Sequence, residues 1–138
     1  MFEEICESRF VNQTRGETYM AKGDDIQDRL IDFAVAVIKL CASLPDNREG
    51  RHASGQFLRC GTSPAPNYGE ARGAESVNDF VHKLGIVRKE LNESGIWLEI
   101  IRRSGMLAPT RLRPVANECA ELAKIISASI RTARMKCP

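Results

Sequence analysis

The chain has few aromatic residues, which make up 6% of its 138 residues. Sandwiches and barrels of short strands are rich in aromatic and β-branched side chains, so this scarcity disfavours an all-β fold. Uninterrupted apolar runs are also short, far below the roughly 20 residues that a membrane-spanning helix needs. The sequence therefore favours one helical domain with no membrane segment, long enough to bury its own core.

Cysteine and histidine are sparse and irregularly spaced. The five cysteines form no Cys-x-x-Cys pair, and an odd number fits reduced thiols better than a disulfide framework. A di-iron bundle needs Glu-x-x-His motifs. The nearest matches are Glu49 with His52, in an expected connector, and Asp79 with His82, where the acid is aspartate. Because glycine-rich phosphate-binding runs are absent as well, we expect no metal, no cofactor and no enzymatic activity.

The N-terminal segment has neither a secretory signal nor a clear helical pattern. Three acids occupy the first seven residues, where a signal peptide carries basic residues. We therefore expect a cytoplasmic protein. Residues 1–23 show weak periodicity and are interpreted as a flexible extension, so that residues 24–138 form the folded domain.

Two helices are predicted in the first half of that domain. The first covers residues 24–44 and is followed by a connector at 46–51. A second helical stripe runs over residues 53–71, but Pro64 and Pro66 each remove a backbone donor, so we expect a kink or a break there. The predicted core stripe of the first helix consists of Ile26, Leu30, Phe33, Ala34, Val37, Ile38, Cys41 and Leu44.

A heptad ladder predicts the third helix, which Ser76 can cap and Gly105 ends. Its two seam positions are occupied by Val77, Leu84, Leu91 and Leu98 and by Phe80, Val87, Ser94 and Ile101. A second apolar row contains Ile86, Trp97 and Ile100. A helix that is apolar on two sides is buried on two sides, either inside the subunit or against another subunit.

The fourth helix is expected to begin around Pro109 and Thr110, with Pro114 in its first turn. Its apolar stripe continues to Ala133. Four helices with short connectors predict an all-α, antiparallel up-down-up-down four-helix bundle.

Positive charge is concentrated in the last third of the sequence. Residues 1–50 hold 6 basic and 10 acidic side chains, whereas residues 97–138 hold 8 and 3. In a bundle, the basic residues that end the third helix and begin the fourth lie near one pole, and those that end the fourth lie near the other. Such clusters are either solvated helix ends or a nucleic-acid surface. The candidate phosphate-binding residues are Arg102, Arg103, Arg131, Arg134 and Lys136.

One stretch of polar residues carries a family resemblance. Residues 56–71, 79–94 and 97–99 resemble the bacterial four helix bundle protein family, which includes proteins encoded in intervening sequences of large-subunit ribosomal RNA genes. The accessory variability determinant of diversity-generating retroelements is related to that family. The most specific match is the Arg-x-x-x-Ser-x-x-x-Asn-x-x-Glu pattern of Arg59, Ser63, Asn67 and Glu70. Their spacing places them on one helix face, where we expect a polar row at a helix or subunit contact.

The resemblance implies a homopentamer of four-helix bundles with no known catalytic activity. In the retroelement relatives it implies a basic ring surface that binds nucleic acid and a reverse transcriptase. This chain departs from the family pattern in its prolines, because Pro64 and Pro66 flank Ala65. Two hypotheses follow: an accessory protein that binds RNA or DNA through an oligomer's basic surface, or a structural scaffold without a nucleic-acid role.

Overall fold

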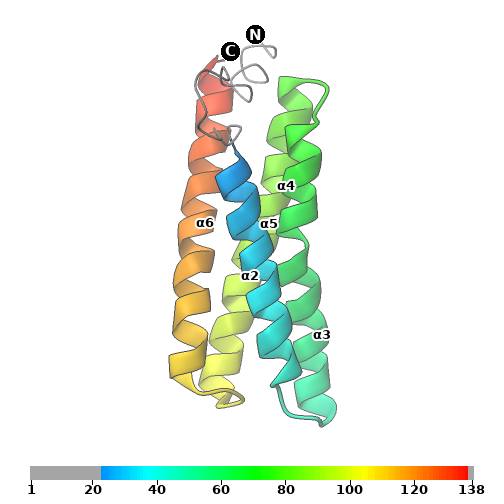
Figure 1. Cartoon of the computed structure of the whole chain (residues 1–138), viewed down its shortest axis with the longest axis vertical. Coiled ribbons are helices and arrows are strands. Elements are labelled where there is room, and N and C mark those ends of the chain that lie inside the picture. The colour runs from blue at the N-terminus through cyan, green and yellow to red at the C-terminus, as the bar shows by residue number, and fades with distance from the viewer. Residues whose placement is uncertain (1–22, 137–138) are drawn as a thin grey trace, which may run out of the picture.

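The computed structural model describes residues 23–136, and these residues form five helices and no strand. The helices are α2 (Asp24–Ala42), α3 (Arg48–Thr62), α4 (Pro64–Arg72), α5 (Val77–Ser104) and α6 (Pro109–Lys136). Because α3 and α4 stack end to end as one bent rod, the chain builds an antiparallel four-helix bundle, as predicted (Figure 1). The predicted extension, residues 1–23, lies outside the described residues except for Gly23.

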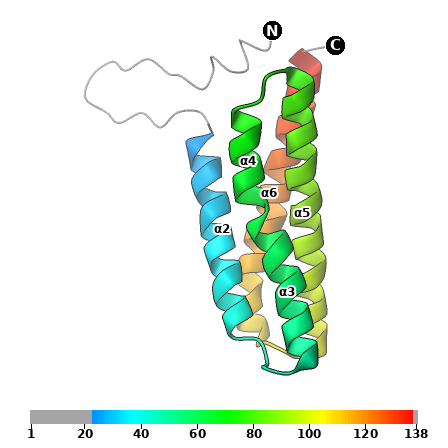
Figure 2. The ribbon, with the colours of Figure 1, turned by 90° about the vertical axis from the view of Figure 1, so that its right-hand side faces the viewer.

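The four rods pack around the core in the order α2, α3–α4, α5 and α6, and α6 then meets α2. Figure 2 shows α2 on one side of the α3–α4 rod and α5 on the other. Both α2 and α5 run toward the end of the bundle that holds the α2–α3 and α5–α6 connections (Figure 1). The face between α2 and the α3–α4 rod and the face between that rod and α5 are therefore neighbours.

The heptad ladder of α5 fills the centre of the core, as predicted. Leu84, Val87, Leu91 and Ile101 have no exposed surface, and Ser94 is equally buried. The Ser94 hydroxyl donates to the Glu90 carbonyl at 2.8 Å, which satisfies the polar group inside an apolar layer. Partners from the other helices complete the core, including Leu30, Phe33, Val37, Phe57, Leu122, Ile126 and Ile130.

One prediction for the core is wrong: Ile38 of α2 is 50% exposed. Leu30, Phe33, Val37 and Cys41 already cover the inward face of α2. Ile38 lies one residue beyond Val37, about 100° farther around the helix axis, and so it falls on the flank rather than in the core.

The expected break in the second helix occurs at Ser63, between α3 and α4. Pro64 and Pro66 lack the backbone donors that would continue the helical hydrogen bonds. The backbone at Ser63 nevertheless keeps right-handed helical angles, with φ −74° and ψ −35°, so the rod bends without turning back. The side-chain amide of Asn67 donates to the Ser63 carbonyl and to its hydroxyl, both at 2.9 Å, and spans the break.

Two helix boundaries differ from the sequence-based prediction. The expected connector at 46–51 is already helical from Arg48, because the Asn47 side chain accepts from the Gly50 N–H at 2.7 Å and caps α3. Glu49 and His52 are thus on a helix. Pro114 lies in the second turn of α6 rather than the first, because the helix begins at Pro109.

The Ser76 cap and the Gly105 terminator of α5 are confirmed. The Ser76 hydroxyl accepts from the Asp79 N–H at 3.0 Å. Gly105 has a φ of 74°, a left-handed conformation that glycine adopts without strain.

Candidate nucleic-acid interface

The five candidate phosphate-binding residues lie at opposite ends of the bundle. Arg102 and Arg103 are in the last turn of α5, and Arg131, Arg134 and Lys136 are near the end of α6. Arg111 is in the first turn of α6, just after the connection from α5, and from Arg111 to Arg131 this helix rises about 30 Å. The structure therefore separates the candidates into two groups that do not form one surface within a subunit.

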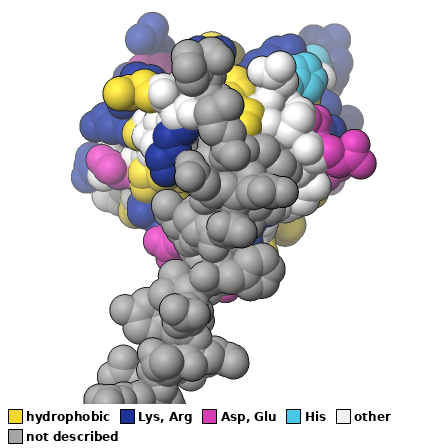
Figure 3. Space-filling view, turned by 90° about the horizontal axis from the view of Figure 1, so that it is seen from above, with side chains coloured by type: hydrophobic (Ala, Val, Ile, Leu, Met, Phe, Trp, Pro, Cys, Tyr) yellow, Lys and Arg dark blue, Asp and Glu magenta, His cyan; other side chains and the backbone are white. Residues whose placement is uncertain are grey.

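The two ends of the bundle differ in charge. We call the end formed by residues 39–51 and 99–113 the basic end; it carries seven basic and three acidic side chains. The opposite end, formed by residues 23–28, 70–83 and 131–136, carries five basic and six acidic side chains. Figure 3 looks onto the opposite end, where both kinds of charge are distributed around the rim. Of the two ends formed by described residues, the basic end thus carries an excess of positive charge and the opposite end does not.

Ion pairs occupy some of the cations at the basic end. Glu99 accepts from Arg102 at 2.6 and 2.8 Å and from Arg103 at 2.7 Å. Hydrogen bonds from these two guanidinium groups lower the pKa of Glu99 to about 2. One carboxylate therefore neutralises half of the charge of two predicted site residues and holds both side chains in place.

Arg111 and Arg113 make no ion pair within the described residues, and both are exposed. Arg113 shares a shallow hollow of about 160 Å³ with Arg102 and Glu99, between α5 and α6. Arg111 and Arg113 begin α6 next to the end of α5, so their location near Arg102 and Arg103 could be predicted from the helix ends. The predicted site nevertheless did not include them. Glu99 was missing too, although its spacing of three and four residues from the two arginines is a helical ion-pair pattern.

At the opposite end, basic residues lie among carboxylates. Arg72 pairs with Asp24 at 2.5 Å, and Lys83 pairs with Glu70 at 2.9 Å. Arg131, Arg134 and Lys136 share this end with acidic side chains of α2 and α5. Their position at a helix C-terminus is also where basic residues favour the helix dipole.

The family pattern connects helices within the subunit. Arg59 of α3 contacts two carboxylates of α5, Glu90 at 3.3 Å and Glu93. Ser63 and Asn67 bridge the break between α3 and α4, and Glu70 of α4 accepts from Lys83 of α5. These residues do not form one mutual row; three separate contacts hold the bent rod together and fasten it to α5.

Cys41, Cys60 and Cys119 are buried in the core. Burial raises the pKa of all three thiols, that of Cys119 to about 12. They remain protonated at neutral pH and act as small apolar groups. Cys6 and Cys137 lie outside the described residues.

Neither histidine belongs to a cluster of described residues that could hold a metal ion. His52 packs edge-on against Trp97, with ring centroids 5.9 Å apart, and His82 is exposed. Residues 23–136 contain no group of three histidine, cysteine or acidic side chains that could hold a metal ion. Within the same range, no helix has the length and apolar character required to cross a membrane.

Comparison with known proteins agrees with the bundle architecture. A crystal structure from Bacteroides thetaiotaomicron, described as a protein with unknown function from the S23 ribosomal protein family, is similar, with a TM-score of 0.72 and 33% sequence identity. The match covers 76% of this chain and 97% of that one. A comparison with curated proteins finds no match. Residues 24–128 match the model of the 23S rRNA-intervening sequence protein family, and the chain therefore belongs to that family.

Proposed function

We propose that this protein is a non-enzymatic, cytoplasmic accessory protein that assembles into a ring, in keeping with the pentamer that the resemblance implies, and binds nucleic acid through its basic ends. The observation that carries the proposal is the excess of seven basic over three acidic side chains at the basic end. Arg111 and Arg113 are exposed there and have no carboxylate partner among the described residues.

Assembly gives this modest charge its effect. A single bundle offers a small basic patch, and each phosphate contact contributes weakly at physiological salt. A ring of parallel subunits brings several such patches to one face, where their potentials add and more counterions are released on binding. The name of the matching family refers to 23S rRNA, which makes RNA the first ligand to test.

A protein-interaction scaffold is the second candidate, because several large apolar side chains are exposed. Ile31, Ile38, Ile96 and Ile100 all lie on the bundle surface. A scaffold would use such surfaces to bind proteins and would leave its basic end in solvent.

Two measurements on the full chain separate these functions. Fluorescence anisotropy with labelled RNA and DNA of about 20 nucleotides, at salt concentrations from about 50 to 200 mM, reports phosphate contacts. We expect binding that weakens steeply with salt, and a light-scattering mass several times the 15.4 kDa of one chain. An assembled protein with no affinity at low salt favours the scaffold, and a monomer contradicts the assembly.

A further inference from the structure

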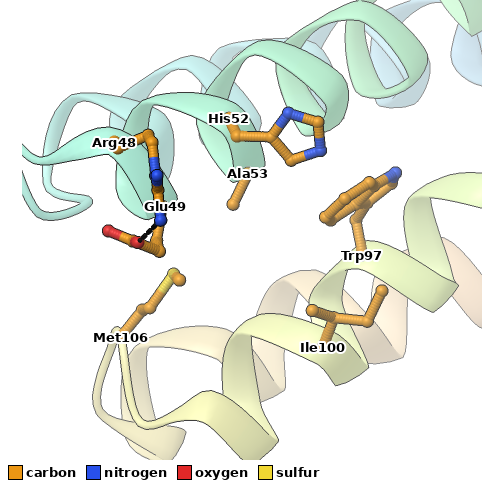
Figure 4. A pocket seen from close by; sticks show the side chains of 7 residues that line it. All are labelled: Arg48, Glu49, His52, Ala53, Trp97, Ile100 and Met106. Atoms are coloured by element: carbon orange, nitrogen blue, oxygen red, sulfur yellow. Dashed lines mark hydrogen bonds and ion pairs between the residues drawn. The ribbon is translucent and has the colours of Figure 1, made fainter.

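Two hollows contain residues of the basic end, and they differ in charge. The larger has a volume of about 420 Å³ and lies between α3 and α5, where Trp97 and Ile100 form one wall (Figure 4). Arg48 at its end is already paired with Glu49 at 3.0 Å. The smaller is the hollow of about 160 Å³ between α5 and α6, which we call the α5–α6 hollow. Arg113 on its rim has no ion pair among the described residues, so of the two the smaller hollow offers an unneutralised cation to a ligand.

The floor of the α5–α6 hollow is apolar and has the size of one ring. Helix α5 contributes Gly95 and Leu98, and α6 contributes Pro109, Leu112 and Ala116. Leu98 and Leu112 are buried, so the floor is continuous with the core. A cavity of about 150 Å³ in a protein core holds one benzene ring. The hollow, with its volume of about 160 Å³, therefore has room for a single six-membered ring.

Arg102 gives the hollow a flat side group in a fixed orientation. Its Nε donates to Oε2 of Glu99 at 2.8 Å, and its Nη2 donates to Oε1 at 2.6 Å. Such a two-pronged pair holds the guanidinium plane in place. Planar guanidinium groups stack on nucleobases much as aromatic rings do. Because Glu99 already balances its charge, Arg102 contributes a stacking surface rather than a free cation.

Glu99 lines the hollow and keeps one acceptor position open. Its Oε1 accepts from both Arg102 and Arg103, whereas its Oε2 accepts from Arg102 alone among the described residues. A carboxylate oxygen has about two acceptor positions, so Oε2 retains one of them. The lowered pKa of Glu99, about 2, keeps the group ionised at neutral pH. An ionised carboxylate repels phosphate and attracts an N–H donor, so the interior of the hollow suits an amino group.

The α6 side of the rim supplies a contact for phosphate. Arg113 is exposed there, and Arg111 lies two residues earlier on the same helix. Neither has a carboxylate partner among the described residues. The hollow and its rim thus combine an acceptor, a stacking plane and a free cation. Single-stranded nucleic acid is recognised through the same three contacts, to a base edge, a base face and a phosphate.

We propose that the α5–α6 hollow binds one unpaired cytosine of a single-stranded RNA. The ring lies on the apolar floor beside Arg102, its N4 amino group donates to Oε2 of Glu99, and its phosphate contacts Arg113. Cytosine has one ring and an exocyclic amino group, whereas uracil carries the acceptor O4 at that position, which a carboxylate repels. A base inside a duplex cannot enter, because both of its faces are stacked. This inference rests on the nucleic-acid part of the proposed function and specifies the RNA that the basic end binds.

Base preference is measured by fluorescence anisotropy of the full chain with labelled oligo(C), oligo(U) and oligo(A) RNA of about 20 nucleotides at about 50 mM salt. We expect oligo(C) to bind about tenfold more tightly than oligo(U), the factor that one charge-assisted hydrogen bond supplies. Oligo(A) should also bind more weakly than oligo(C), because a purine has two rings. A hairpin with a cytosine loop should exceed the same hairpin with a uridine loop, whereas replacing C·G by U·A pairs in its stem should change nothing.

Two variants test the hollow itself. Ala116→Leu fills it without altering any charge, so the preference for oligo(C) over oligo(U) should fall below about twofold while oligo(U) keeps its wild-type affinity and salt dependence. Ala128→Leu makes the same change at an exposed position of α6 outside the hollow and is the matched control. Because Ala116 is half-buried, circular dichroism checks its fold. Glu99→Gln alters only a surface pair, and there we expect tighter binding of oligo(U) together with loss of the preference.

The outcomes separate this inference from the proposed function. If the wild-type protein binds the three RNAs with equal affinity, or binds oligo(A) as tightly as oligo(C), the inference fails while nucleic-acid binding stands. If a folded Ala116→Leu or Glu99→Gln variant keeps the full preference for oligo(C), another surface reads the base and the inference is overturned. A wild-type protein that binds no RNA at low salt overturns both.

Discussion

The close approach of α2 and α3 depends on the missing side chain of Gly61. A Cβ added there would lie 2.6 and 2.7 Å from the two γ-methyl carbons of Val37, in a fully buried contact. Gly55, six residues earlier on the same helix, would place a Cβ in open space. Substituting each glycine by alanine therefore makes the same chemical change with and without a clash.

The expected free energies of unfolding follow from two opposing effects. Alanine stabilises a helix interior by about 0.5–1 kcal/mol relative to glycine. Overpacking a filled core costs about 1–3 kcal/mol. Gly55→Ala should thus raise stability by about 0.5–1 kcal/mol. The free energy of unfolding of Gly61→Ala should be about 1–3 kcal/mol lower than that of Gly55→Ala. Both variants gain the same helix propensity, so the difference between them measures the cost of the clash alone.

Urea unfolding followed by circular dichroism measures both variants at one fixed protein concentration, because assembly would make stability depend on concentration. In a Val37→Ala background the two γ-methyl contacts are gone and a 3.1 Å approach to the Cβ of residue 37 stays, so Gly61→Ala is then expected to cost less stability than it does in the wild-type background. A Gly61→Ala variant as stable as Gly55→Ala in the wild-type background would refute the packing that positions α3 against α2.

Four further predictions concern local chemistry. Glu99→Gln releases Arg102 and Arg103 and should strengthen RNA binding several-fold with a steeper salt dependence, measured by anisotropy; unchanged affinity would contradict a role for the basic end. Because the pKa of Glu99 is lowered to about 2, its contribution to stability is present above about pH 4.5 and is lost as the pH falls toward 2; a carboxyl NMR titration with an ordinary midpoint would disprove this. With Cys6 and Cys137 replaced by serine, the native protein should resist thiol reagents at pH 8 until urea unfolds it, and rapid native labelling would show that the thiols are accessible. Asn47→Ala removes the α3 cap and should cost about 0.5–2 kcal/mol in urea unfolding, whereas wild-type stability would show that the cap contributes nothing.

The bundle could be predicted because each local signal agreed with the others. The α5 heptads, the Ser76 cap and the Gly105 terminator all point to one long helix with one buried seam. The exposed position of Ile38 could not be predicted, since apolar residues on two sides of a helix leave open which side faces the core. Asparagine is a preferred N-cap residue, so Asn47 could have indicated the start of α3 at Arg48. The apolar periodicity, on which the predicted boundary was based, does not contain this information.

The site was only partly predictable for a different reason. Consecutive helices in the bundle run in opposite directions, so the helix ends decide which basic residues lie at the same end. The separation of Arg102 from Arg131 could therefore be predicted from the helix boundaries. Which cations are neutralised depends on side-chain pairing. The structure pairs Arg102 with Glu99 but leaves Arg113 without a carboxylate among the described residues.

The salt dependence of RNA binding in two charge-reversal variants tests the central claim most directly. Arg111→Glu with Arg113→Glu alters the basic end, and Arg131→Glu with Arg134→Glu makes the same change in charge at the opposite end. The account predicts that the first variant loses at least about tenfold in affinity and has a shallower slope of log K against log salt, whereas the second stays close to wild type. Equal losses in both variants, or wild-type binding by the first, would contradict it.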